Sequence, residues 1–152
     1  MSERVIHGFT PDRVFYFFEQ ISQIPRESGN EEGVADYLVR FASERGLFYV
    51  RDDHHNVLIK APATPGREND APLLFQGHTD MVCEKNGDSS HDFAHDPIRL
   101  RLDGNRLSAL GTTLGGDDGI AVAIGLALLA DDTLEHPPLE VLIKEAEVKS
   151  HQ

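Results

Sequence analysis

The sequence is poor in cysteine, tryptophan and basic residues, and it has no long hydrophobic run. Its 152 residues include one cysteine, Cys83, and no tryptophan. A single cysteine excludes an intramolecular disulfide and is typical of proteins from a reducing cytosol. The most apolar stretch, residues 119–130, is too short to cross a bilayer, and residues 1–10 lack the apolar core of a secretion signal. We therefore expect a cytoplasmic protein that has no membrane partner.

The low content of basic residues also bears on the choice of partner. There are 14 lysine and arginine residues against 26 aspartate and glutamate residues, which gives a net charge of −12. A phosphate backbone is repelled by such a surface unless basic residues gather locally. Only Arg99 and Arg101 share a predicted strand face, so we expect no nucleic-acid partner. A solvated acidic surface is the commoner reason for such a charge, and a site that handles cations is the alternative.

The pattern of apolar residues predicts helices that alternate with strands. Amphipathic helices are predicted at residues 11–22 and between Asn30 and Gly46. A helix that is apolar on nearly all sides is predicted at 119–130. Short apolar runs predict strands at 47–50, 56–60, 72–77 and 138–143, and a separate hairpin over 98–110. We therefore predict one α/β domain with a mixed sheet sandwiched by helices, in which chemistry gathers beyond the carboxyl ends of the strands.

His78 and Asp80 lie where the predicted strand 72–77 ends. Alternate residues of an extended chain point the same way, so the two side chains project together. A neutral imidazole is a good zinc ligand, and a carboxylate beside it can hold the ring in one tautomer. The alternative is a strand end capped by a hydrogen-bonded histidine, because such tripeptides often arise by chance.

The stretch "GTTLGGDDG" at 111–119 is the second candidate feature. Its adjacent glycines allow close backbone approach, and Asp117 and Asp118 follow just before the predicted helix. A bridging aspartate is a common way to hold a pair of metal ions. The alternative is that the aspartates only cap the helix and that the glycines only form the turn.

Two further groups of reactive residues favour other roles. His91 and His95 are four residues apart with aspartates beside them, but Pro97 and the nearby "NGDSS" favour a polar loop over a helix. Cys83 follows His78 by five residues, yet no orienting group or oxyanion site is visible. A small apolar packing role is the expectation for Cys83.

Longer stretches of the sequence resemble a known family. The segments "ISQIPRESGNEE", "GHTDMV", "HDFAHDPI", "GTTLGGDDGIAVA" and "PLEVL" are similar to the N-terminal part of aminoacyl-histidine dipeptidase. That enzyme is also called Xaa-His dipeptidase, peptidase D or cytosol non-specific dipeptidase, and it belongs to the co-catalytic zinc peptidases. The resemblance covers nearly the whole chain, and "GTTLGGDDGI" is its most specific motif.

The resemblance implies roles for particular residues. His78 matches the first metal-ligand histidine of the family, and Asp80 matches the aspartate that orients it. Asp117 matches the aspartate that bridges two metal ions, whereas the neighbouring Asp118 is not expected to bind metal. The family then has two adjacent glutamates shortly after "PLEVL", a general base followed by a metal ligand.

The sequence departs from the family pattern at this glutamate pair. Glu147 falls at the general-base position, but Val148 occupies the ligand position, and valine cannot coordinate a metal. The threonine and glycine expected around the pair are also absent. As an alternative, "KEAEVK" is by itself a good solvated helix former.

The resemblance implies a dinuclear zinc dipeptidase that hydrolyses dipeptides, with a preference for Xaa-His, through a metal-activated water. Co²⁺ or Mn²⁺ could replace Zn²⁺. We expect residues 1–152 to form the N-terminal part of the catalytic domain, without its remaining ligands and without the second domain, which in the full-length homodimer supplies dimer contacts. Such a truncated chain is expected to be inactive alone. A non-catalytic α/β pseudoenzyme or interaction module is the alternative function.

Overall fold

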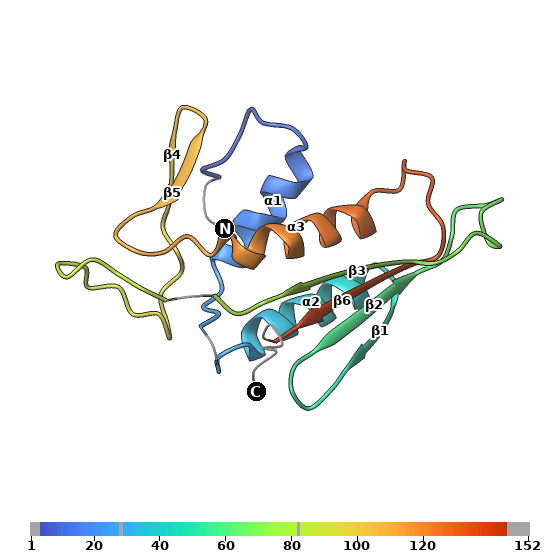
Figure 1. The fold of residues 1–152 in the computed structure, drawn as a ribbon, viewed down its shortest axis with the longest axis horizontal. Coiled ribbons are helices and arrows are strands. Elements are labelled where there is room, and N and C mark those ends of the chain that lie inside the picture. Colours follow the sequence, from blue (N-terminus) through green and yellow to red (C-terminus); the bar gives the residue numbers. More distant parts are fainter. Residues whose placement is uncertain (1–3, 28, 82, 146–152) are drawn as a thin grey trace.

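The computed structural model describes residues 4–27, 29–81 and 83–145. In chain order, the elements among these residues are α1 (Asp12–Ser22), α2 (Glu32–Glu44), β1 (Phe48–Arg51), β2 (Val57–Ala61), β3 (Leu73–His78), β4 (Leu100–Asp103), β5 (Arg106–Ala109), α3 (Gly116–Ala130) and β6 (Leu139–Lys144) (Figure 1). Each agrees with its predicted range to within a few residues. Among the described residues, no helix is both long and apolar enough to span a bilayer.

Four of the strands form a mixed sheet in the order β1-β2-β6-β3, and β4 and β5 form a separate hairpin. β2 is antiparallel to β1 and to β6, whereas β3 is parallel to β6. Ile143 of β6 lies opposite Val57 of β2 and Gly77 of β3, so one row of residues crosses the sheet there. The prediction of an α/β fold with a mixed sheet is confirmed.

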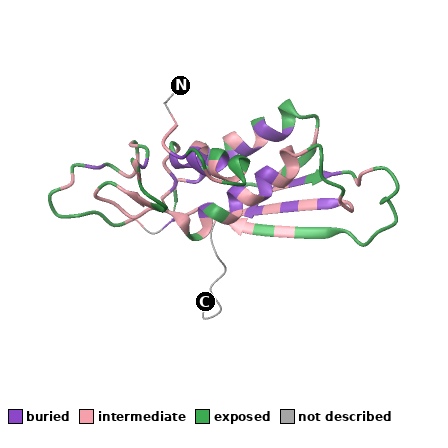
Figure 2. Ribbon diagram, turned by 90° about the horizontal axis from the view of Figure 1, so that it is seen from above, coloured by how far each residue is buried: buried purple, intermediate pink, exposed green. Residues whose placement is uncertain are grey.

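The core lies on one face of this sheet. Burial alternates along β6, where Leu139, Val141 and Ile143 are buried and the residues between them are partly exposed, and Figure 2 shows this alternation along the strand. The buried residues pack with those of β2 and of the helices in one cluster. α3 lies close to the sheet because Gly125 has no side chain, and a Cβ there would be 3.0 Å from Val141.

The helices do not sandwich the sheet in the described part of the chain, which corrects one detail of the prediction. α1 and α2 meet through Phe17 and Phe41, whose ring centroids are 5.5 Å apart, and both helices share their core with α3. Residues paired across neighbouring strands point to the same face, so Phe48, Lys60, Glu140 and Leu74 form a row on the opposite face. Phe48 is 58% exposed and Leu74 53%. The described helices all pack on the apolar face of the sheet. The opposite face, which carries this row, therefore stays open among the described residues.

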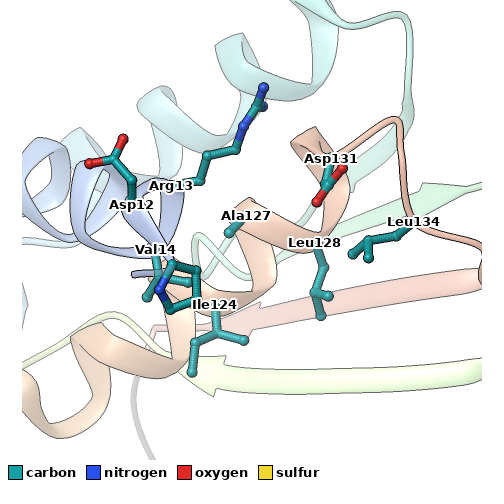
Figure 3. Close-up of a pocket in the computed structure, with 9 residues that line it drawn as sticks. Asp12, Arg13, Val14, Ile124, Ala127, Leu128, Asp131 and Leu134 are labelled. Carbon is teal, nitrogen blue, oxygen red and sulfur yellow. The ribbon is translucent and has the colours of Figure 1, made fainter. Parts of the chain in front are cut away.

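α3 is also open along one side, although its sequence is apolar on nearly all sides. Val122, Ala123 and Leu126 are buried, whereas Ile124 and Leu128 line a groove of about 760 Å³. Val14 at the start of α1 and Leu134 after α3 complete its apolar lining (Figure 3). The described residues leave this groove uncovered.

The one-sided core makes a stability prediction. Ile59 is fully buried, so Ile59→Ala should lower the free energy of unfolding by about 2–5 kcal/mol through lost contacts and a residual cavity. Leu74→Ala on the open face removes similar atoms from a half-exposed site and should change the free energy of unfolding by about 0.5 kcal/mol or less. Urea denaturation of the two variants measures both effects, and equal losses would contradict a core confined to one face.

Candidate metal centre

The candidate site forms where β3 and β6 end side by side. Their parallel pairing continues past the strands, because the Thr79 amide donates to the Lys144 carbonyl at 2.8 Å and the Asp80 amide to the Glu145 carbonyl at 3.2 Å. The Thr79 side chain is also buried against this segment, with its hydroxyl 3.2 Å from the Lys144 carbonyl. The backbone on both sides of His78 is therefore held by a neighbouring strand.

His78 contacts a carboxylate through each ring nitrogen. Its Nδ1 lies 2.9 Å from Asp80 Oδ1 and 3.1 Å from the Asp80 carbonyl. Its Nε2 lies 3.2 Å from Asp117 Oδ1. The His78 and Asp80 side chains are 15% and 18% exposed, whereas that of Asp117 is 92% exposed. The structure thus brings together three of the four residues that the sequence indicated, with Asp117 on the solvent side of the ring.

The two aspartates at the start of α3 face the strand end. The N-cap residue of α3 is Gly115, which makes no side-chain capping hydrogen bond. Asp117 and Asp118 have non-helical backbone angles and are joined by a cis peptide bond. Asp118 Oδ2 accepts a hydrogen bond from the His78 amide at 3.2 Å. Both carboxylates therefore contact His78, that of Asp117 at the ring and that of Asp118 at the backbone amide.

The surrounding charges act on the His78 ring. Burial by itself lowers the pKa of His78, but the negative charges of Asp80 and Asp118 and the hydrogen bonds to Asp80 and Asp117 outweigh it, so the pKa of His78 is raised. Carboxylate oxygens only accept hydrogen bonds, so a ring nitrogen that carries a proton donates to the carboxylate that it faces. The ring therefore lies in a pocket of negative potential that favours a positive charge.

The nitrogen and oxygen atoms at this site are of the types that bind metal ions. The described residues provide too few of them for a complete site. An imidazole nitrogen and a carboxylate oxygen are ligands that zinc accepts, and a closed zinc site has about four ligands. Among residues 4–27, 29–81 and 83–145, no group of three or more histidine, cysteine or acidic side chains is arranged to hold a metal ion. Glu147, the fourth residue indicated by the sequence, and Val148 lie outside the described residues.

Comparison with known proteins adds an independent observation. The sequence is 46% identical over 147 residues to the cytosol non-specific dipeptidase of Escherichia coli K12, which covers 97% of this chain and 30% of that protein. The crystal structure of aminoacylhistidine dipeptidase from Vibrio alginolyticus matches with a TM-score of 0.90 and 45% identity, over 94% of this chain and 29% of that one. The resemblance to aminoacyl-histidine dipeptidases is confirmed.

This similarity to aminoacyl-histidine dipeptidases extends over only part of their length, since the chain spans about 30% of the relatives it matches. A more distant structure shares the fold: a dinuclear metal-binding peptidase of the M20 family from Bacillus subtilis, with a TM-score of 0.52 and 16% identity over 90% of this chain and 35% of that one. No family model matches the sequence.

His91, His95 and Cys83 lie outside this site, in the kinds of position that the sequence indicated. His91 and His95 are in a loop, as predicted, and His95 Nδ1 pairs with Asp92 at 2.8 Å in an exposed position. Cys83 is half-buried and its thiol donates to the Met81 carbonyl at 3.5 Å. Burial raises the pKa of the Cys83 thiol, which is the opposite of what a nucleophile needs.

Arg26 is the residue at this site that the sequence analysis did not single out. Its side chain is 2% exposed and reaches the backbone of both site segments. A lone arginine is usually a surface residue, and a solvated role is the default for one that follows a proline between helices. Only the quoted "PRESGNEE" string, shared with the aminoacyl-histidine dipeptidase resemblance, marks it in the sequence.

The close approach of α3 to the strand end predicts the effect of a small substitution. A Cβ at Gly77 would lie 3.0 Å from Asp118 Oδ2 and 3.2 Å from Ala121 Cβ. Gly77→Ala should therefore lower the free energy of unfolding by about 1–3 kcal/mol through overpacking and shift the NMR signals of the His78 ring. Gly87→Ala is the matched control, because its Cβ would meet nothing within 4 Å. A Gly77→Ala variant indistinguishable from this control would contradict the described contact.

Proposed function

We propose that this chain carries part of the active site of a dinuclear zinc dipeptidase, a cytoplasmic hydrolase. The observation that supports it most strongly is the His78 ring, with Asp117 3.2 Å from one nitrogen and Asp80 2.9 Å from the other. An imidazole held by a carboxylate on one nitrogen and facing a second carboxylate on the other is the arrangement that a metal-binding histidine uses. The similarity to proteins named as dipeptidases supports the reaction class.

Each described residue has a distinct role in this proposal. His78 binds a metal ion through Nε2, and Asp80 orients the ring through Nδ1. Asp117, on the solvent side of the ring, would be the carboxylate that holds both ions. Asp118 holds the start of α3 to the end of β3 through the His78 amide. When bound, the ions would polarise the peptide carbonyl and lower the pKa of a water molecule between them.

Glu147 is the proposed general base, which takes a proton from the attacking water. It follows by two residues a segment whose carbonyls accept hydrogen bonds from the Thr79 and Asp80 amides. This sequence proximity to the site supports the assignment, whereas valine at position 148 argues for a glutamate pair that is incomplete in this chain.

The same proposal covers the substrate, the metal, the domain organisation and the cellular location of the protein. The substrate is a dipeptide, with Xaa-His preferred, and the metal is Zn²⁺ with Co²⁺ or Mn²⁺ as substitutes. Residues 1–152 form the first part of the catalytic domain of a protein that, at full length, has further ligands and a second domain and is a homodimer. The Escherichia coli relative is named for the cytosol, which supports the cytoplasmic location.

Zinc titration tests the ligand assignment. His78→Ala and Asp117→Ala should each weaken Zn²⁺ binding by more than about tenfold, because changes outside the ligand set already cost about 10–100-fold. His95→Ala is the matched control, since His95 also pairs with an aspartate, at 2.8 Å. Isothermal titration calorimetry measures the dissociation constants. Equal affinities for the wild-type chain and the His78→Ala variant would refute the assignment.

A second measurement tests the expectation that the 152-residue chain lacks activity. In the presence of Zn²⁺, the purified chain should hydrolyse an Xaa-His dipeptide no faster than the buffer, because the described residues offer two metal-binding side chains where a dinuclear site needs more. Ninhydrin detection of released amino acids measures the rate. Hydrolysis that disappears in the His78→Ala variant would show instead that this chain completes the site.

A further inference from the structure

Arg26 lies between the two segments that carry the candidate ligands. Its Nη1 donates to the Thr79 carbonyl at 3.0 Å, and its Nη2 donates to the Gly115 carbonyl at 2.7 Å. Thr79 lies between His78 and Asp80, and Gly115 precedes Asp117 by two residues. One planar guanidinium, whose donors have a fixed spacing, therefore bonds to the backbone on both sides of the site.

The space for the guanidinium is provided by two glycines. Gly115 has a φ of +79°, and a Cβ there would lie closer to Arg26 Nη2 than real atoms approach. At Gly119, on the first turn of α3, a Cβ would lie 2.6 Å from the same nitrogen and 3.1 Å from Phe18. The turn into α3 is thus shaped around the arginine head group, and no residue with a side chain fits at either position unless Arg26 moves.

Holding a cation here is costly for the fold. Burial lowers the pKa of Arg26 to about 10, although the nearby Cys83, Asp80 and Asp118 oppose this shift. The Nε of Arg26 is buried without a hydrogen-bond partner among the described residues. Buried charges add little net stability, and apolar replacements of similar volume are often neutral or stabilising. Stability alone therefore does not account for an arginine at this position.

We propose that Arg26 is a positioning residue of the candidate metal centre, which sets the separation between the segment of His78 and the segment of Asp117. It acts through the carbonyls of Thr79 and Gly115, to which its two terminal nitrogens donate. The effect of Arg26 on metal binding rests on the proposed function. Its effect on the position of His78 relative to Asp117 does not depend on a metal.

Two substitutions in the full 152-residue chain test this role. Arg26→Met fills much of the same volume without donors, and Arg26→Lys retains a cation that can reach a carbonyl. We expect Arg26→Met to shift the ¹⁵N signals of the His78 ring and to weaken Zn²⁺ binding by about 10–100-fold, the range typical of residues that support metal ligands. Arg26→Lys should recover only part of both effects, because an ammonium group lacks the fixed fork that reaches both carbonyls. Ile59→Ala, destabilised at a site away from these segments, should leave the ring signals in place.

The two readouts separate the possible failures. If the wild-type chain does not bind Zn²⁺ but Arg26→Met still moves the His78 signals, the proposed function fails and the positioning role stands. If Arg26→Met leaves the ring signals and the zinc affinity as they are in Ile59→Ala, the positioning role is overturned. Should Arg26→Met fail to fold, Arg26→Lys decides, because unchanged His78 signals together with unchanged zinc affinity in that variant would exclude a dependence on the two-carbonyl geometry.

Discussion

The parallel pairing of β3 with β6 is the constraint on which the rest of the structure depends. Parallel neighbours cannot be joined by a tight turn and require a long crossover. In this chain the crossover contains the β4–β5 hairpin and α3, which runs along β3 (Figure 1). Because β3 and β6 end together, the backbone after β6 hydrogen-bonds to Thr79 and Asp80. The return of the chain to β6 therefore decides which side chains can meet at the strand ends.

At that meeting point the balance of charge is unusual for a partly buried site. Asp80, Asp117 and Asp118 all contact His78, and Arg26 lies behind them with its charge directed at backbone carbonyls. Three carboxylates held near one imidazole repel one another unless a cation is present. A protonated ring meets this need in part, and a metal ion is the other kind of cation that the same oxygen and nitrogen atoms accept.

Much of this arrangement could be predicted from local patterns. The spacing of His78 and Asp80 on an extended chain places both on one side, and the apolar runs locate the elements, because these depend on neighbours in sequence. The contact between His78 and Asp117 came from family resemblance, since no local rule relates residues on different elements. The kink at Asp117 and Asp118, where the backbone angles are non-helical, could not be read from the local pattern of glycines and aspartates. Arg26 was missed because its burial results from the approach of two distant turns, which only the tertiary structure shows.

The space left at Gly115 and Gly119 links these two neighbouring positions to Arg26, which is distant in sequence. Any side chain at either glycine would collide with the head group of Arg26, and at Gly115 the φ of +79° disfavours a side chain as well. The reverse substitution, a small residue at 26 alone, leaves a void beside two bare backbone turns. Changes at Gly119 and at position 26 are therefore expected to occur together, whereas position 115 stays glycine because of its positive φ.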